Sequence, residues 1–168
     1  LLPRTIGVSN ESEEGKKLTK RRSAIFREKF LPHLQALKGS RDLVKRVRSD
    51  GLNAIVATSA KDEELRGLLK AAQVADLMEE KATASDAKRS KPDPDIIHAA
   101  IEESGVSPSE LVMIGDTPYD IEAAIKAHVA PIGFRSGGWT DEELKGAVEI
   151  YAFGDRRLAL VVLHEGRD

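Results

Sequence analysis

Residues Leu111–Ala124 read LVMIGDTPYDIEAA, and this stretch decides how the rest of the chain is interpreted. Its first four residues are apolar, as in a strand that is buried on both faces of a parallel sheet. Gly115 and Asp116 follow the apolar run, and a second carboxylate comes at Asp120. The intervening Thr and Pro suit a helix N-cap and a first helical position, so capping alone could explain Asp120. It does not explain Asp116, and the pair is therefore a candidate metal site as well as a candidate strand-to-helix junction.

Short apolar runs and helical patterns alternate on both sides of this stretch, and the alternation predicts the fold class. Strands that alternate with helices of about 10 residues indicate an α/β fold in which helices cover a parallel sheet. The strands are expected at 53–58, 111–114, 130–134 and 148–153. The helices are expected at 11–37 with a break at Pro32, 40–51 with Ser40 as N-cap, 61–72, 94–104 with Asp93 as N-cap, 120–127, 140–143 from a Thr140–Glu143 capping box, and 158–163.

The composition is that of a soluble globular domain and excludes several classes of protein. The chain has 168 residues, of which 40% are hydrophobic and 32% charged, and it contains no cysteine. No apolar run approaches the roughly 18 residues of a membrane helix, and no charged-then-apolar leader opens the sequence. A cytoplasmic protein without disulfides or thiolate sites is therefore expected, with no membrane partner.

The charge is unevenly distributed along the chain. Residues 1–50 hold 13 Lys and Arg against 6 Asp and Glu, whereas the remainder holds 13 against 22. A basic half of this kind is usually a solvated helix face, but it could also attract an anionic substrate. Nucleic-acid binding is not expected, because few aromatic residues are interleaved with the basic ones.

Polar side chains stand where the predicted strands end, and together they suit a phosphoryl group. Thr58 and Ser59 come after the run 53–57 at the end of one strand, Gly115 and Asp116 come after the run 111–114, and Lys91 lies in a loop between them. Ligands of parallel sheets bind at the carboxyl ends of the strands. Hydroxyls and a lysine can hold phosphate oxygens, and Asp116 with Asp120 can hold Mg²⁺. Alone, the hydroxyls could cap the next helix and the lysine could be solvated.

The sequence also offers an internal comparison for the Gly-Asp stretch. Phe153-Gly154-Asp155 repeats the apolar-Gly-Asp pattern, but the residue four positions after the carboxylate is Ala159. An ordinary turn is the better interpretation there, because no second carboxylate follows.

The order of these motifs resembles that of the haloacid dehalogenase-like hydrolases. Residues 55–59 (Ile-Val-Ala-Thr-Ser), 90–92 (Ser-Lys-Pro) and 114–120 (Ile-Gly-Asp-Thr-Pro-Tyr-Asp) look like the second, third and fourth motifs of the family. The resemblance is to the branch of phosphoglycolate phosphatases and β-phosphoglucomutases. It implies a helical-cap remnant at residues 1–38 and a Rossmann-like core at 39–168. The sequence departs from the pattern at His128, where relatives usually end the helix with Gly.

The resemblance implies a function and a role for each site residue. The function is Mg²⁺-dependent hydrolysis of a small phosphorylated metabolite through an aspartyl-phosphate. Thr58, Ser59 and Lys91 would bind phosphate, and Lys91 would also orient the nucleophile. Asp116 would bind Mg²⁺, and Asp120 would bind it or position Asp116. Thr58, Lys91 and Asp116 are thus the expected catalytic residues.

The first motif of the family, a strand that ends in Asp-x-Asp-Gly-Thr and carries the nucleophile, is absent from this sequence. The Asp93-Pro94-Asp95 stretch follows no apolar run and precedes Ile-Ile. In the family that strand lies between the strands carrying the second and fourth motifs. It could belong to a longer form of this protein, it could come from another chain, or the protein could be a non-catalytic derivative. The 168 residues alone are not expected to turn over phosphate esters.

Other functions remain open at this stage. A sugar phosphomutase or a haloacid dehalogenase would belong to the same family. A non-catalytic module is a further alternative, either a receiver-like switch or a pseudoenzyme. Receiver domains also combine acidic residues, Thr or Ser, and Lys, but their acidic pair comes early in the chain, whereas Asp116 and Asp120 come last.

Overall fold

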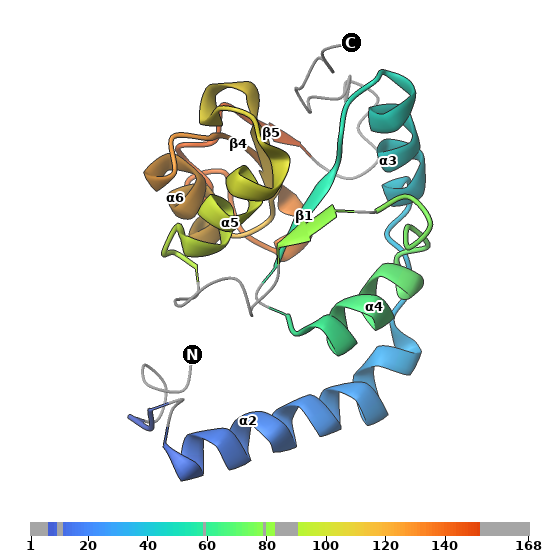
Figure 1. The fold of residues 1–168 in the computed structure, drawn as a ribbon, viewed down its shortest axis with the longest axis vertical. Coiled ribbons are helices and arrows are strands. Elements are labelled where there is room, and N and C mark those ends of the chain that lie inside the picture. Colours follow the sequence, from blue (N-terminus) through green and yellow to red (C-terminus); the bar gives the residue numbers. More distant parts are fainter. Residues whose placement is uncertain (1–6, 10–11, 59, 79, 83–90, 152–168) are drawn as a thin grey trace.

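Two small parallel sheets form the centre of the fold. The computed structural model describes residues 7–9, 12–58, 60–78, 80–82 and 91–151 (Figure 1). The strands pair in the orders β1-β2 and β3-β4-β5, and every pairing is parallel. Their bounds are Ile55–Ala57 for β1, Glu80–Ala82 for β2, Val112–Gly115 for β3, Ala130–Phe134 for β4 and Glu149–Tyr151 for β5.

Helices follow the strands in alternation, which confirms the prediction of an α/β fold with a helix-covered parallel sheet. No helix within the described ranges is long and apolar enough to cross a membrane. The α-helices are α2 (Glu13–Ile25), α3 (Ser40–Ser49), α4 (Asp62–Ala71), α5 (Asp95–Ser104) and α6 (Pro118–Lys126), with shorter turns η1 (Phe26–Phe30), η2 (Leu31–His33), η3 (Pro108–Glu110) and η4 (Arg135–Gly137).

The main core lies where α5 and α6 pack on the strands. Ile96 and Ile97 of α5 are buried together with Ala123 and Ala124 of α6, and Met113 of β3 packs against this cluster. Alanine side chains occupy little volume, so α6 can lie close to the sheet. Its N-terminus, which follows Asp116, is thereby held at the carboxyl end of β3.

The predicted elements agree with the structure except at a few places that have physical reasons. The strand at 130–134 is confirmed, but Gly39 and Pro94 are the N-caps in place of Ser40 and Asp93. β2 was not predicted, because its Glu-Lys-Ala sequence has no apolar run. The helix expected at 158–163 lies outside the described residues, and so does the end of the strand expected at 148–153.

The helix expected at 140–143 is wrong, although its capping box forms. Thr140 N donates to Glu143 Oε2 at 2.9 Å, and Glu143 N donates to Thr140 Oγ1 at 3.3 Å. Residues 141–144 nevertheless form only a turn. The chain returns at once to the sheet, where Val148 N donates to Pro131 O at 2.8 Å, so no length is left for a helix.

Pro32 alters the N-terminal helix earlier and more strongly than expected. α2 ends at Ile25 and continues as a π-helical turn over Phe26–Phe30, followed by a 3₁₀ turn over Leu31–His33. Proline has no N–H, and its ring crowds the carbonyl four residues earlier, so the preceding turn widens. The second helix expected after Pro32 does not form, because Leu34 is already extended.

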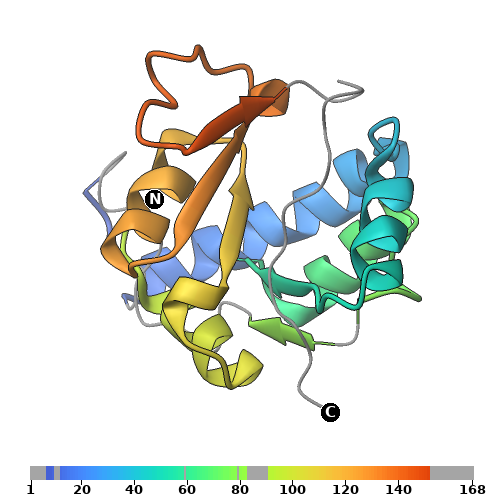
Figure 2. The same ribbon diagram turned by 90° about the horizontal axis from the view of Figure 1, so that it is seen from above.

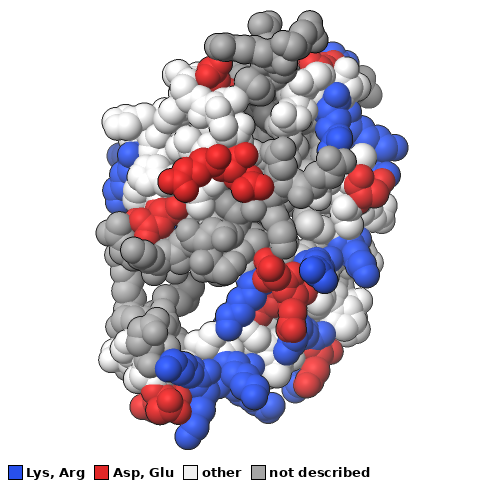
Figure 3. Space-filling model, in the orientation of Figure 1, with Lys and Arg blue, Asp and Glu red and all other residues white. Residues whose placement is uncertain are grey.

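The basic N-terminal half lies mostly on exposed helix faces. Lys and Arg gather over the part of the surface where α2 lies (Figure 3). Arg22 of α2 donates to both carboxylate oxygens of the buried Glu64 of α4 at 3.0 Å, and Arg27 pairs with Glu63. Pairing of this kind attaches the expected cap remnant to α4, and it favours the solvated-face interpretation of the basic residues.

An apolar cavity separates the two sheets. It has a volume of about 240 Å³ and is lined by Ile55 and Ala57 of β1, by residues 111–114 around β3, and by Val44 and Val47 of α3. Among the described strands, β1 and β3 each lack a partner on the edge that faces the other (Figure 2). Free strand edges inside a fold leave backbone groups unpaired. The first strand that the family resemblance implies is expected at this position.

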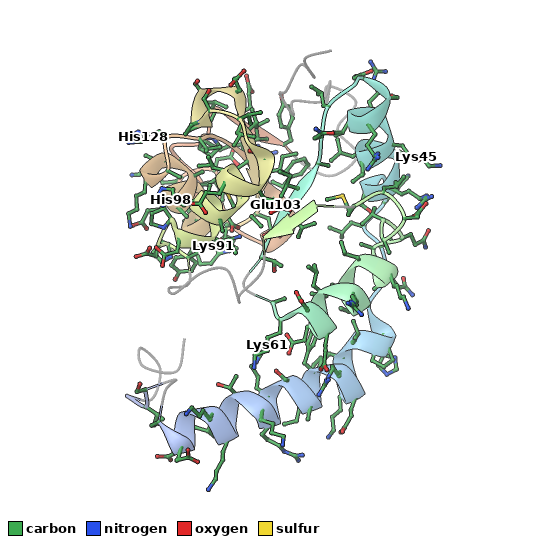
Figure 4. The ribbon with its side chains drawn as sticks, viewed as in Figure 1. Lys45, Lys61, Lys91, His98, Glu103 and His128 are labelled. Carbon is green, nitrogen blue, oxygen red and sulfur yellow. The ribbon has the colours of Figure 1, made fainter. Side chains whose placement is uncertain are left out.

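His128, which follows α6 where relatives usually have Gly, adopts a left-handed backbone conformation. Its φ is +60°, its side chain is exposed, and it lies away from Lys91 on the outer flank of the core (Figure 4). A left-handed conformation is strained for any residue with a Cβ atom. We expect His128→Gly to raise the free energy of unfolding by about 0.5 to 1 kcal/mol, measured by urea denaturation.

The matched control for this prediction is Glu122→Gly, which is also exposed on α6 but lies in the helix interior. Glycine there should destabilise the protein by about 1 kcal/mol. Equal losses from both glycines would show that the backbone of His128 is not strained.

Candidate functional site

Lys91 connects the motifs that the sequence placed together. Its Nζ donates to Asp120 Oδ1 at 2.7 Å and to the carbonyl of Ala57 at 3.3 Å. Ala57 ends β1 and Asp120 lies in the first turn of α6, so one ammonium group connects the end of one sheet with the strand-to-helix junction of the other. The side chains of Lys91 and Asp120 are only 20% and 11% exposed. Figure 4 places Lys91 at the side of the core that faces α2 and α4.

Asp120 is buried, and both of its carboxylate oxygens are engaged. Besides Lys91 on Oδ1, Oδ2 accepts from Thr117 N at 3.1 Å, Thr117 Oγ1 at 2.8 Å and Asp116 N at 3.3 Å. Thr117 is the N-cap, as predicted, and forms a capping box with Asp120. The capping interpretation is therefore correct, and it coexists with the contact to Lys91.

The residue before Asp116 must be small for this arrangement to form. A Cβ atom at Gly115 would lie 2.3 Å from Asp120 Cβ, far inside van der Waals contact. The glycine at the end of β3 therefore allows the Asp120 side chain to lie under the strand end, where it meets Lys91.

Asp116 lies at the carboxyl end of β3 and is only partly buried. Its Oδ2 accepts from Ser136 Oγ at 3.1 Å, and Ser136 belongs to the turn η4 after β4. β3 and β4 are adjacent and parallel, with Gly115 opposite Gly133, so their carboxyl ends meet at this edge. Asp116 thus lies beside Asp120, whose Oδ2 accepts from Asp116 N.

Thr58 directly follows Ala57, the carbonyl of which Lys91 contacts. Its Oγ1 accepts from Ala60 N at 3.1 Å, while the N-cap of α4 is Lys61. The alternative in which Thr58 caps the next helix is therefore wrong. Ser59 lies outside the described residues, as do Asp155 and its surroundings.

The carboxylates fit Mg²⁺ in a limited sense. Within the described ranges no cluster of three or more His, Cys, Asp or Glu side chains could hold a metal. Mg²⁺ is usually held in proteins by only one or two carboxylates, together with waters and substrate phosphate. Within the described residues Oδ1 of Asp116 has no hydrogen-bond partner, whereas both carboxylate oxygens of Asp120 accept hydrogen bonds. Asp116 therefore fits a direct ligand, and Asp120 fits the positioning role that the sequence left as its alternative.

Sequence reasoning missed Ser136 and the aromatic pair beside it. Tyr119 and Trp139 contact edge to face, with ring centroids 6.3 Å apart and an interplanar angle of 83°. The same rule that identified Thr58 and Asp116 would have found Ser136, because it stands just beyond the predicted strand at 130–134.

Comparison with known proteins supports the family that the motif order indicated. The sequence model described as haloacid dehalogenase-like hydrolase matches residues 3–134. A probable phosphatase, IndB, of Dickeya dadantii (strain 3937) is 30% identical over 126 residues, which are 74% of this chain and 55% of that protein. The chain spans about half the length of the curated relatives that it matches.

Two solved structures share the fold. A hydrolase from Pseudomonas syringae has a TM-score of 0.81 and 29% identity, over 90% of this chain and 69% of that one. The β-phosphoglucomutase (pgmB) of Clostridium difficile has a TM-score of 0.74 and 21% identity, over 89% and 66%. These similarities confirm the predicted fold.

Proposed function

We propose that this chain, which belongs to the haloacid dehalogenase-like hydrolase family, is the phosphate- and Mg²⁺-binding part of a phosphomonoester hydrolase for a small phosphorylated metabolite. The observation that carries the proposal is the pair of bonds from Lys91 to Asp120 and Ala57. It brings a cation and the Asp120 carboxylate to the end of β1, and the backbone bond from Asp116 N to Asp120 Oδ2 places Asp116 beside them, at the carboxyl ends of parallel strands, where ligands bind.

Each residue has a distinct role in this proposal. Thr58 and Ser59 donate hydrogen bonds to phosphoryl oxygens, and Lys91 supplies positive charge that Asp120 holds in place. Asp116 is the ligand for Mg²⁺, which would supply further positive charge toward the phosphoryl group when bound. Catalysis of phosphoryl transfer depends mainly on such positioning and electrostatic stabilisation.

The attacking carboxylate belongs to a segment outside these 168 residues. In the reaction an aspartate attacks phosphorus, the ester P–O bond breaks, and the alcohol leaves with a proton from a general acid. Water then cleaves the aspartyl-phosphate and releases phosphate. The apolar cavity between β1 and β3 supports this assignment, because a strand placed there would end beside Thr58 and Asp116.

The test is phosphate release from a panel of phosphomonoesters by the full-length protein that carries this sequence. We expect turnover that requires Mg²⁺ and stops in EDTA, and no turnover by the 168-residue polypeptide alone. Phosphate release by that polypeptide would contradict the assignment of the nucleophile to another segment.

The same assay separates the alternatives. Halide release from a haloacid that persists in EDTA would favour a dehalogenase, because that reaction needs no Mg²⁺. Interconversion of sugar phosphates without net phosphate release would favour a mutase. A full-length protein without any of these activities would favour a non-catalytic module.

A further inference from the structure

We infer that Ser136 is a positioning residue that holds the Asp116 carboxylate for Mg²⁺; this inference rests on the proposed function. Ser136 Oγ donates to Asp116 Oδ2 at 3.1 Å. Within the described residues, this hydroxyl is the one hydrogen-bond partner of the Asp116 side chain. A carboxylate with one oxygen fixed in this way presents its other oxygen, Oδ1, in a defined direction.

The backbone of the same turn is fitted closely against Asp116. A Cβ atom at Gly137 would lie 2.0 Å from the carbonyl oxygen of Asp116 and 3.0 Å from Cδ1 of Trp139. Only glycine allows this approach. The turn is therefore placed by contact with the Asp116 backbone itself, which sets the position of the neighbouring Ser136 hydroxyl.

Two further contacts stabilise the turn. Arg135 donates from Nε to Asp141 Oδ1 at 2.7 Å and from Nη2 to Asp141 Oδ2 at 2.8 Å, and this guanidinium lowers the pKa of Asp141. On the other side, Trp139 meets Tyr119 edge to face. Tyr119 lies in the first turn of α6, so this ring contact links the segment after β4 to the Asp116–Asp120 stretch, while the Arg135–Asp141 pair holds that segment to itself.

Restraint of the Asp116 carboxylate by Ser136 should strengthen metal binding, because an unrestrained side chain loses conformational freedom when the ion binds. Asp116 is partly exposed, and without Ser136 its side chain would have to be ordered when the ion binds. Partners that orient a metal ligand typically contribute about 10- to 100-fold to metal affinity. We expect the lower end of that range here, because Ser136 is exposed to water.

The experiment is a Mn²⁺ titration of the full-length protein, followed by the electron paramagnetic resonance signal of the free ion. Ser136→Ala should weaken Mn²⁺ binding about 10-fold, and Ser136→Thr, which keeps a hydroxyl, should restore it. Gly137→Ala provides an independent variant, because it displaces the turn without removing the hydroxyl, and it should weaken binding as well. Ser49→Ala, an exposed serine that bonds only to the backbone of α3, is the control and should bind as the unmodified protein does.

The outcomes separate this inference from the proposed function. If Asp116→Asn and the unmodified protein bind Mn²⁺ equally, the metal site itself is wrong. If Asp116→Asn loses binding while Ser136→Ala retains it, the proposed function stands and the role of Ser136 is overturned. Loss in both Ser136→Ala and Ser136→Thr would also overturn it, since the hydroxyl would then not be the cause. Unchanged thermal unfolding of Ser136→Ala would exclude loss of the fold as the reason for weaker binding.

Discussion

Asparagine in place of Asp116 should lower Mg²⁺-dependent phosphate release by the full-length protein about 100-fold or more. The substitution keeps the shape of the side chain and an acceptor for Ser136 Oγ, which now lies 3.1 Å from Asp116 Oδ2. It removes the negative charge that a hard divalent ion needs. A loss of about 3 kcal/mol of transition-state stabilisation corresponds to this factor. Steady-state kinetics at saturating Mg²⁺ would measure it.

Asp155 offers the matched control, because Phe153-Gly154-Asp155 repeats the apolar-Gly-Asp pattern. We expect Asp155→Asn to leave turnover unchanged. The dependence of turnover on Mg²⁺ concentration is a second check. Asp116→Asn should also raise the Mg²⁺ concentration that gives the half-maximal rate. Unaltered turnover and Mg²⁺ dependence in Asp116→Asn would contradict the metal assignment.

The sequence indicates candidate site residues most directly where chemistry and position coincide in one motif. Asp116 and Thr58 directly follow apolar runs, and the carboxyl ends of parallel strands meet at one edge. Lys91 was predictable only from its order among the motifs, since nothing local distinguishes it from a solvated lysine. Its bond to Asp120 depends on how α5 and α6 pack, which periodicity does not specify.

The parts that the sequence did not predict depend on contacts between distant segments. Ser136 meets Asp116 across 20 residues of sequence, and Gly137 gives no sign by itself that a backbone carbonyl lies against it. β2 is a similar case: its residues have no strand pattern, and it forms because β1 offers an edge for parallel pairing. A weak local preference was overridden in each case by a partner supplied by the fold.

Alanine in place of Asp120 should destabilise the protein by about 3 kcal/mol, the largest effect on stability that we expect from a single site residue. The substitution leaves the Lys91 ammonium, which is 20% exposed, without its carboxylate, and it removes the acceptor for Thr117 N and Asp116 N. Breaking one partner of a buried ion pair is costly because the remaining charge stays poorly solvated. Urea denaturation of the full-length protein would measure the change.

The capping box formed by Thr140 and Glu143 provides the comparison. Glu143 stands in the same relation to Thr140 as Asp120 does to Thr117, but its carboxylate is exposed and contacts no lysine of the core. Glu143→Ala should therefore cost much less than Asp120→Ala. Similar losses would mean that capping alone explains Asp120, and the bond to Lys91 would then contribute nothing measurable to the fold. A double variant of Lys91→Met and Asp120→Ala that is more stable than Asp120→Ala would show that the isolated ammonium is the source of the loss.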